Sequence, residues 1–234
     1  MTRINQVAAV VPAAGVGSRM QSACPKQYLS LNGETVLQHS VKALSQDPRI
    51  THIYIAVSAD DPYFASQEFA NSVQITRVTG GASRAASVQA GVAAAVADGY
   101  DWVAVHDAAR PCLSATELSA VLDGALADPV GALLALPVAD TLKRADSAQR
   151  SGATVARDGL WQALTPQVFR SRQLLTGLEQ LGADNPQLTD EASVLEAIGQ
   201  QPRLIQGKRS NIKITLPGDE QLAQLWLQAT TRDS

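Results

Sequence analysis

Short apolar runs alternate with stretches of helical periodicity along most of this chain. The predicted strands of the first half are Val7–Val11, Ile53–Val57, Val73–Val78, Trp102–Val105 and Leu133–Val138. The predicted helices between them are Glu34–Ser45, Ser83–Ala97 and Ser114–Ala127. Several of the strands are apolar on both faces, as strands are when helices cover both sides of a parallel sheet. The alternation predicts an α/β fold with a Rossmann-like, mainly parallel sheet and helices on both faces.

The alternation is interrupted after Val138. Residues 139–160 are polar and lack a helical period, yet Thr141–Lys143 and Ala153–Ala156 have strand-like composition. A structureless loop of about 20 residues is unusual in a compact domain, so we expect a protruding β-arm here. The elements predicted after the arm are the helices Ser171–Leu181, Thr189–Ile198 and Pro217–Ala229 and the strands Arg203–Gln206 and Ile212–Thr215. The 234 residues then form a single domain, 1–234, with an appended arm.

Charge and cysteine content exclude several classes of protein. The net charge of −3 argues against a general nucleic-acid binder, although a few well-placed cations suffice for a small phosphorylated substrate. The two cysteines form no C-x-x-C pair, so neither a zinc site nor a disulfide framework is expected, and reduced thiols suit the cytosol. The chain begins MTRINQ without the apolar core of a signal peptide, and no run approaches about 18 apolar residues. We therefore expect a cytoplasmic protein with no membrane partner.

The first strand ends in a glycine-containing loop that leads to two cations. Gly15 and Gly17 allow close backbone approach to a ligand, and Arg19 and Lys26 follow them. The loop lacks the third glycine of a dinucleotide fingerprint, because Met20 stands there, and it contains no G-K-[ST] of a Walker A loop. Amide donors followed by two cations indicate a site for a polyphosphate.

Two further strand ends carry residues of the same kind. Gly80 and Gly81 precede Arg84 and Ser87 at the start of a helix, where an anion is favoured. Asp107 follows the fourth strand, where its carboxylate could hold a Mg²⁺–phosphate complex or a substrate hydroxyl. Because the carboxyl ends of parallel strands share one edge of the sheet, a nucleotide lying across these loops is the expected ligand. The neighbouring His106 is either a catalytic base or, more commonly for a histidine in this setting, a core residue.

An ordered set of motifs resembles one family of enzymes. The segments "PAAGVGSRM", "PKQY", "VHDAARP", "DTLK", "LWQALTPQ", "TDEAS" and "NIKIT" resemble the 2-C-methyl-D-erythritol 4-phosphate cytidylyltransferases over about residues 7 to 220. The resemblance implies transfer of CMP from CTP to the methylerythritol phosphate, giving 4-diphosphocytidyl-2-C-methyl-D-erythritol and pyrophosphate. It also implies a nucleotide-diphospho-sugar transferase-like fold and a homodimer joined through the arm at 139–160.

The resemblance also implies a role for each matching residue. Catalytic roles on the triphosphate fall to Arg19 and Lys26. The residues expected around the nucleotide are Ala13, Ala14, Gly15, Gly81, Arg84, Ser87, Asp107 and Ala108. The residues expected around the second substrate are Asp107, Arg110, Thr141, Arg157, Thr165, Thr189 and Lys213, with Arg157 supplied by the partner subunit. The expected cofactor is Mg²⁺, held mainly by the CTP phosphates with Asp107 as a weak ligand. Ala82 and Ser83 stand where the family often has acidic residues, so an acidic contact is not expected there.

The expected chemistry needs no nucleophilic triad. A phosphate monoester is largely dianionic near pH 7, since its second pKa is about 6, so it can attack the α-phosphorus of CTP in line. Positioning and cationic stabilisation then carry the catalysis. A cytidylyltransferase for another polyol phosphate, such as ribitol 5-phosphate, is the nearest alternative. An NAD-dependent oxidoreductase and a CTP sensor that releases no pyrophosphate are the others.

Overall fold

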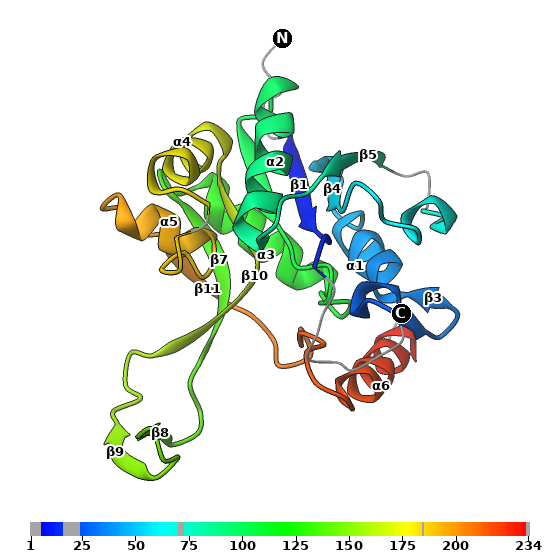
Figure 1. Ribbon diagram of the computed structural model, residues 1–234. Helices are drawn as coiled ribbons and strands as arrows, with labels where there is room; N and C mark the ends of the chain where they lie inside the picture. Colours follow the sequence, from blue (N-terminus) through cyan, green and yellow to red (C-terminus); the bar gives the residue numbers. More distant parts are fainter. Residues whose placement is uncertain (1–5, 16–23, 70–72, 184, 233–234) are drawn as a thin grey trace.

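The computed structural model describes residues 6–15, 24–69, 73–183 and 185–232, and in it one sheet lies between two layers of helices (Figure 1). The strands of this sheet are β1 (Val7–Pro12), β4 (Ile50–Val57), β5 (Gln74–Thr79), β6 (Trp102–Val105), β7 (Gly131–Pro137), β10 (Trp161–Arg170) and β11 (Arg203–Gln206). The α-helices are α1 (Val36–Leu44), α2 (Arg84–Ala97), α3 (Ala115–Leu126), α4 (Ser171–Leu181), α5 (Glu191–Ala197) and α6 (Asp219–Arg232). A short hairpin of β2 (Ser30–Leu31) and β3 (Glu34–Thr35) precedes α1.

The order of the strands reverses direction at β1. The order is β11-β7-β10-β6-β1-β4-β5, and every neighbouring pair is parallel except the two that include β10. From β1 the chain continues to β4 and β5 on one side and then crosses to β6 on the other. Ligands of open α/β sheets bind at the carboxyl ends of strands at such a reversal. The predicted Rossmann-like, mainly parallel sheet is confirmed.

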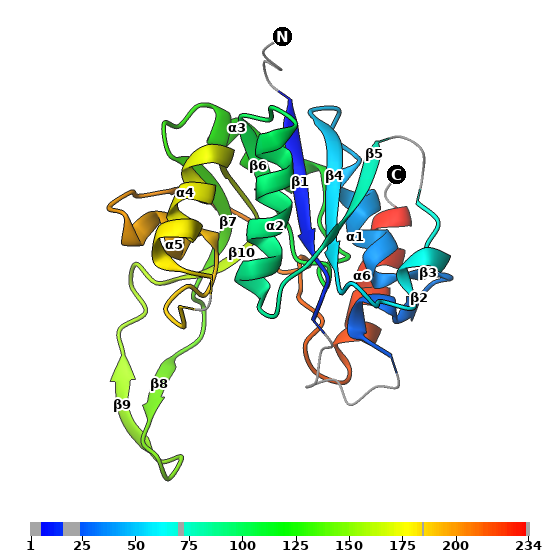
Figure 2. The ribbon, with the colours of Figure 1, turned by 45° about the horizontal axis from the view of Figure 1, so that its top comes forward.

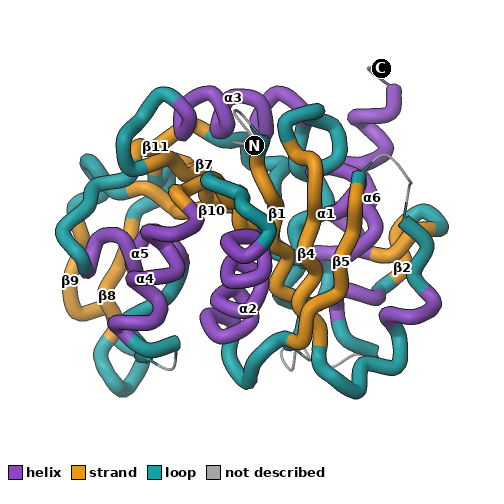
Figure 3. The backbone as a smooth tube through the Cα atoms, turned by 90° about the horizontal axis from the view of Figure 1, so that it is seen from above, coloured by secondary structure: helices purple, strands orange, loops and turns teal. Residues whose placement is uncertain are grey.

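The core lies on both faces of the sheet. The residues of β1 from Val7 to Val11 are completely buried, because helices cover each face. On one face Leu37 of α1 and Leu122 of α3 belong to one apolar cluster, and on the other Val88 of α2 and Leu174 of α4 belong to a second (Figures 2 and 3). None of the helices in the described ranges is long and apolar enough to cross a membrane.

Strand β10 is a ten-residue element that the sequence pattern did not predict. It pairs antiparallel with β6 and with β7, in the middle of the sheet. A proline has no N–H for a strand ladder, so Pro166 argues against a central strand. The structure accommodates it with an irregularity in the register against β7 between Ala163 and Gln167.

One predicted strand is absent, and three predicted helices begin two residues later than expected, at Val36, Glu191 and Asp219. Residues 212–215 are an irregular segment and not a strand; the N–H of Ile214 donates to the carbonyl of Ala109 (2.9 Å), so the segment is held by the loop after β6. The helix predicted to begin at Thr189 begins at Glu191, and its N-cap is Asp190, whose carboxylate accepts from the N–H of Ser193 (2.9 Å).

The polar segment between β7 and β10 contains two strands. Strands β8 (Leu142–Ala145) and β9 (Ser151–Val155) pair antiparallel and protrude from the body of the molecule (Figures 1 and 2). At the base of this arm the N–H of Val138 donates to the carbonyl of Leu160 (3.0 Å). The predicted two-stranded arm is therefore present, with both of its strands largely exposed.

Candidate active site

The loop after β1 is held in place by side chains from neighbouring segments. The Gln27 amide donates to the carbonyls of Ala13 (2.7 Å) and Gly15 (3.1 Å), and the Ser58 hydroxyl donates to the carbonyl of Ala14 (3.2 Å). A Cβ added at Gly15 would meet none of the described residues within 4 Å, so the backbone is uncrowded by them there. This part of the loop is a fixed, uncrowded surface to which a ligand can come close. Arg19 and Gly17 lie outside the described residues.

The second glycine turn packs directly against the first loop. A Cβ at Gly80 would lie 2.8 Å from the Cβ of Ala14, and one at Gly81 would lie 2.3 Å from the Cβ of Ala86. The N–H of Gly81 donates to the Ser87 hydroxyl (3.1 Å), which ties the turn to the start of α2. The two loops therefore meet only because Gly80 lacks a side chain, and the turn packs on the start of α2 only because Gly81 lacks one.

Asp107, at the carboxyl end of β6, is surrounded by three cations. Its Oδ1 lies 3.0 Å from both Nε and Nη2 of Arg84, and its Oδ2 lies 2.8 Å from Nζ of Lys213 and 3.5 Å from Nε of Arg110. Burial alone would raise the pKa of Asp107, but these three cations hold the pKa well below its usual range. The carboxylate stays ionised and orients the cations around it.

His106 is buried beside Asp107, and both of its ring nitrogens form hydrogen bonds within the fold. Its Nε2 lies 3.0 Å from the carbonyl oxygen of Arg110, which can only accept, so Nε2 carries the proton. Its Nδ1 therefore accepts from the Thr165 hydroxyl (2.9 Å), and the same oxygen accepts from the N–H of Asp107 (3.1 Å). Burial lowers the pKa of His106 to about 4. Both ring nitrogens are occupied, so this neutral histidine positions Asp107 and is not placed to act as a base.

Two lysines approach the site from opposite ends of the chain. Lys26 lies in a short 3₁₀ helix, Lys26–Tyr28, and its Nζ donates to the carbonyl of Ile214 (2.9 Å). Lys213, the preceding residue in that segment, reaches Asp107 as described. The segment 211–215 is thus the element that brings the two ammonium groups into the same region.

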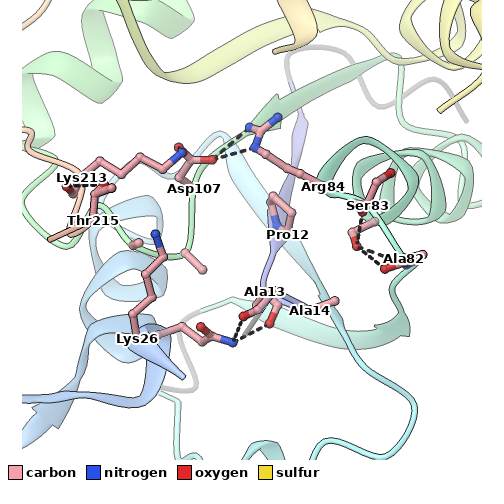
Figure 4. A pocket seen from close by; sticks show the side chains of 16 residues that line it. Pro12, Ala13, Ala14, Lys26, Ala82, Ser83, Arg84, Asp107, Lys213 and Thr215 are labelled. Carbon is pink, nitrogen blue, oxygen red and sulfur yellow. Dashed lines mark hydrogen bonds and ion pairs between the residues drawn. The ribbon is translucent and has the colours of Figure 1, made fainter. Parts of the chain in front are cut away.

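These loops enclose a cavity of about 380 Å³ at the carboxyl edge of the sheet (Figure 4). Its lining is Pro12, Ala13, Ala14, Gly15, Lys26, Gln27, Gly81, Ala82, Ser83, Arg84, Ser87, Asp107, Ala108, Ala109, Lys213 and Thr215. All eight residues predicted around the nucleotide belong to this lining, together with Lys26 and Lys213. A cavity of this size suits a small ligand, and its described charged residues are three cations and one carboxylate.

The other predicted substrate residues lie outside this lining. Arg110 and Thr165 are buried behind Asp107, where Arg110 donates through Nη1 to the carbonyl of Asn211 (2.7 Å). Thr189 is exposed in the loop before α5, and Thr141 is exposed at the base of the arm. Arg157 is exposed on the arm and donates to the carbonyl of Ala139. Within one chain, the arm residues are not part of the cavity.

Two residues that the sequence pattern missed support the site. Gln27 fixes the loop after β1, and Glu191 binds both Nη1 and Nη2 of Arg84. Gln27 is adjacent to Lys26 in the segment "PKQY". Glu191 has the position of an ordinary acidic residue in the first turn of a helix, where it would favour the helix dipole without any partner. Nothing in the local pattern marks either as a partner of a residue far along the chain.

The described residues offer little to hold a metal ion by themselves. They contain no group of three or more His, Cys, Asp or Glu side chains arranged as metal ligands. Both oxygens of Asp107 already face cations. Mg²⁺ prefers carboxylate, phosphate and water oxygens, so a protein-held Mg²⁺ does not fit this donor set without displacement of Lys213.

Comparison with known proteins identifies a family. The family model for 2-C-methyl-D-erythritol 4-phosphate cytidylyltransferase matches residues 7–229. Proteins of that name from Vibrio cholerae serotype O1 (46% identity, 99% of this chain and 100% of the relative) and Escherichia coli O7:K1 (49% identity, 96% and 94%) are similar over nearly their whole length. A crystal structure of 4-diphosphocytidyl-2C-methyl-D-erythritol synthase has 37% identity and a TM-score of 0.82 over 95% of this chain and 98% of its own. The crystal structure of the cytidylyltransferase from Francisella tularensis has 30% identity and a TM-score of 0.79 over 94% of this chain and 99% of its own.

Proposed function

This chain belongs to the 2-C-methyl-D-erythritol 4-phosphate cytidylyltransferase family, and we propose that the cavity between the loop after β1, the start of α2 and Asp107 is the place where it binds CTP. The enzyme transfers CMP from CTP to the phosphate of 2-C-methyl-D-erythritol 4-phosphate. The products are 4-diphosphocytidyl-2-C-methyl-D-erythritol and pyrophosphate. The observation that carries the assignment of the cavity is the convergence of Lys26 and Lys213 on one hollow beside two glycine loops.

The proposed mechanism depends on positioning and positive charge. The substrate phosphate is largely a dianion near neutral pH, so it attacks the α-phosphorus without a protein base. His106 is not needed as one, which agrees with its buried, neutral state. Lys26, with Arg19 from the same loop, would stabilise the charge that develops on the triphosphate as pyrophosphate leaves. The glycine loops would place amide donors along the nucleotide.

The polyol phosphate would bind on the Lys213 side of the cavity. Asp107 and Lys213 are the cavity residues proposed to hold it, and Arg110 and Thr165 would act from behind Asp107. Thr141 and Thr189 retain their predicted substrate roles as proposals. Both are exposed, so each is accessible to a ligand that extends beyond the cavity.

We propose that the active enzyme is a homodimer in which the arm of one subunit brings Arg157 to the cavity of the other. The arm is exposed in a single chain, and Leu160 and Trp161 at its base are more than one-third exposed (38% and 39%), which supports a covered state in an assembly. Subunit mixing tests this. K26M and R157A variants should each be weakly active alone, and a mixture that has exchanged subunits should regain activity, because one of its two sites has both residues intact. A mixture that stays as inactive as its components, after exchange is verified by mass, would contradict the proposal.

Mg²⁺ and the cellular location are also proposals. Because the described residues form no metal cluster, we expect the ion to enter with CTP and to be bound mainly by phosphate oxygens and water. Chelation should abolish turnover, and excess Mg²⁺ should restore it. The reduced thiols Cys24 and Cys112 and the phosphorylated substrates fit a cytoplasmic enzyme.

A pyrophosphate-release screen tests the function. CTP, UTP, ATP and GTP are each combined with 2-C-methyl-D-erythritol 4-phosphate or ribitol 5-phosphate in the presence of Mg²⁺. We expect release only with CTP and the methylerythritol phosphate. Comparable pyrophosphate release with ribitol 5-phosphate would contradict the proposed substrate specificity. CTP binding without any pyrophosphate release would show that the protein is a CTP sensor and not a transferase.

A further inference from the structure

Arg84 lies between two buried carboxylates and uses different edges of its guanidinium for each. Nη1 and Nη2 donate to Oε1 (2.6 Å) and Oε2 (3.2 Å) of Glu191. Nε and Nη2 face a single oxygen of Asp107, Oδ1, at 3.0 Å. Because the guanidinium is planar and its donors form a rigid fork, Glu191 sets the plane in which Arg84 meets Asp107.

Glu191 is itself held by the fold. It is 2% exposed and is the first residue of α5. The start of this helix is fixed to β10 by Gln167, whose amide oxygen accepts from the N–H of Ala192 (2.8 Å) and whose amide nitrogen donates to Asp190 (2.9 Å). The carboxylate therefore reaches Arg84 from a rigid position in a different layer from Asp107.

The two oxygens of Asp107 are consequently not equivalent. Oδ1 is occupied by Arg84, whereas Oδ2 faces Lys213 (2.8 Å), which lines the cavity. Burial raises the pKa of Glu191, and the positive charge of Arg84 opposes that shift. Burial alone would lower the pKa of Arg84, but the negative charges of Glu191 and Asp107 raise it. With Arg110, the cluster holds three cations and two carboxylates, so Glu191 supplies the second negative charge that Arg84 needs.

We propose that Glu191 is a positioning residue for the transfer reaction, which acts through Arg84 to keep Oδ1 of Asp107 occupied and Oδ2 turned towards Lys213 and the polyol phosphate. This inference rests on the proposed role of Asp107 in binding that substrate. Loss of the Glu191 charge frees Arg84 to rotate, so Arg84 then competes with Lys213 for Asp107. The polyol phosphate loses its aligned partners, while the glycine loops that bind the nucleotide are unchanged.

The test is a double-mutant cycle with both substrates. E191Q keeps the size of the side chain and removes its charge. We expect it to raise KM for 2-C-methyl-D-erythritol 4-phosphate about tenfold and KM for CTP by a smaller factor, because Arg84 also lines the cavity proposed for CTP. R84M should raise the same KM, and E191Q added to R84M should change it by less than about twofold, because Glu191 acts only through Arg84. R84K, which keeps the charge but loses the fork, replaces R84M if that variant does not fold.

The controls separate this proposal from a structural effect and from the function itself. E196Q, on the exposed side of the same helix, should behave as wild type. Unchanged kinetics in E191Q, multiplicative effects in the double variant, or equal losses for both substrates would overturn the proposal. Wild-type protein that releases no pyrophosphate would instead refute the proposed function, and normal binding of the polyol phosphate by D107N would refute the role of Asp107.

Discussion

Acidification should destabilise the native protein through His106, and removal of that histidine should weaken the effect. The pKa of His106 is lowered by burial to about 4, from an ordinary value of 6.5. Between these values the unfolded chain binds a proton that the native chain does not, so the free energy of unfolding falls as the pH falls. One such proton is worth about 1.4 kcal/mol per pH unit, or about 3 kcal/mol over the whole interval.

Urea unfolding measured at about pH 7.5, 6.5, 5.5 and 4.5 gives the slope directly. H106Q removes the titrating ring, so its slope between about pH 6.5 and 4.5 should be smaller than that of wild type by about one proton. Asp107 titrates below this range in both proteins, because its pKa lies well below the usual value. The two slopes are compared and not the absolute stabilities, since H106Q also loses the hydrogen bonds to Thr165 and Arg110. Parallel slopes would refute the argument that His106 is held neutral by burial.

Three further predictions concern individual residues. K26M should lower kcat by about 100-fold with native thermal stability, and a normal kcat would remove Lys26 from the mechanism. G81A should lower the free energy of unfolding by about 1–3 kcal/mol, because its Cβ would lie 2.3 Å from that of Ala86. G15A should unfold like wild type and raise KM for CTP. Urea unfolding curves and steady-state kinetics distinguish the two variants, and a larger loss of stability in G15A than in G81A would contradict the packing described. Cys112 should resist iodoacetamide in the native enzyme at about pH 8, since burial raises the pKa of its thiol to about 12; rapid labelling by mass spectrometry would disprove this.

The layers of the fold and the lining of the cavity could be predicted because both depend on local pattern. Strands β6 and β11 and helix α4 begin and end at the predicted residues. The two glycine-containing loops come directly after β1 and β5, at the carboxyl ends of these strands. Once a parallel sheet is expected, the carboxyl ends of its strands lie at one edge, so Gly15, Gly81 and Asp107 are brought together without knowledge of any contact.

Features that depend on distant contacts could not be predicted. Pro166 and the polar residues around it conceal a central strand, because the register irregularity between Ala163 and Gln167 that accommodates the proline arises only in the pairing with β7. Arg110 follows Asp107 by three positions, and sequence does not say whether its side chain turns into the cavity or behind the carboxylate. Glu191 matches an ordinary helix start, and its pairing with Arg84 spans 107 positions.

The contact between Lys26 and Ile214 joins positions 188 residues apart. Lys26 leaves the ribosome early in synthesis and Ile214 leaves it near the end. A nascent chain can therefore fold much of the sheet before the segment 211–215 is available to line the cavity. Catalytic competence is therefore among the last properties the polypeptide acquires. Damage near the carboxyl terminus, in the stretch that leads into α6, would leave a folded body whose nucleotide loops lack the opposing wall.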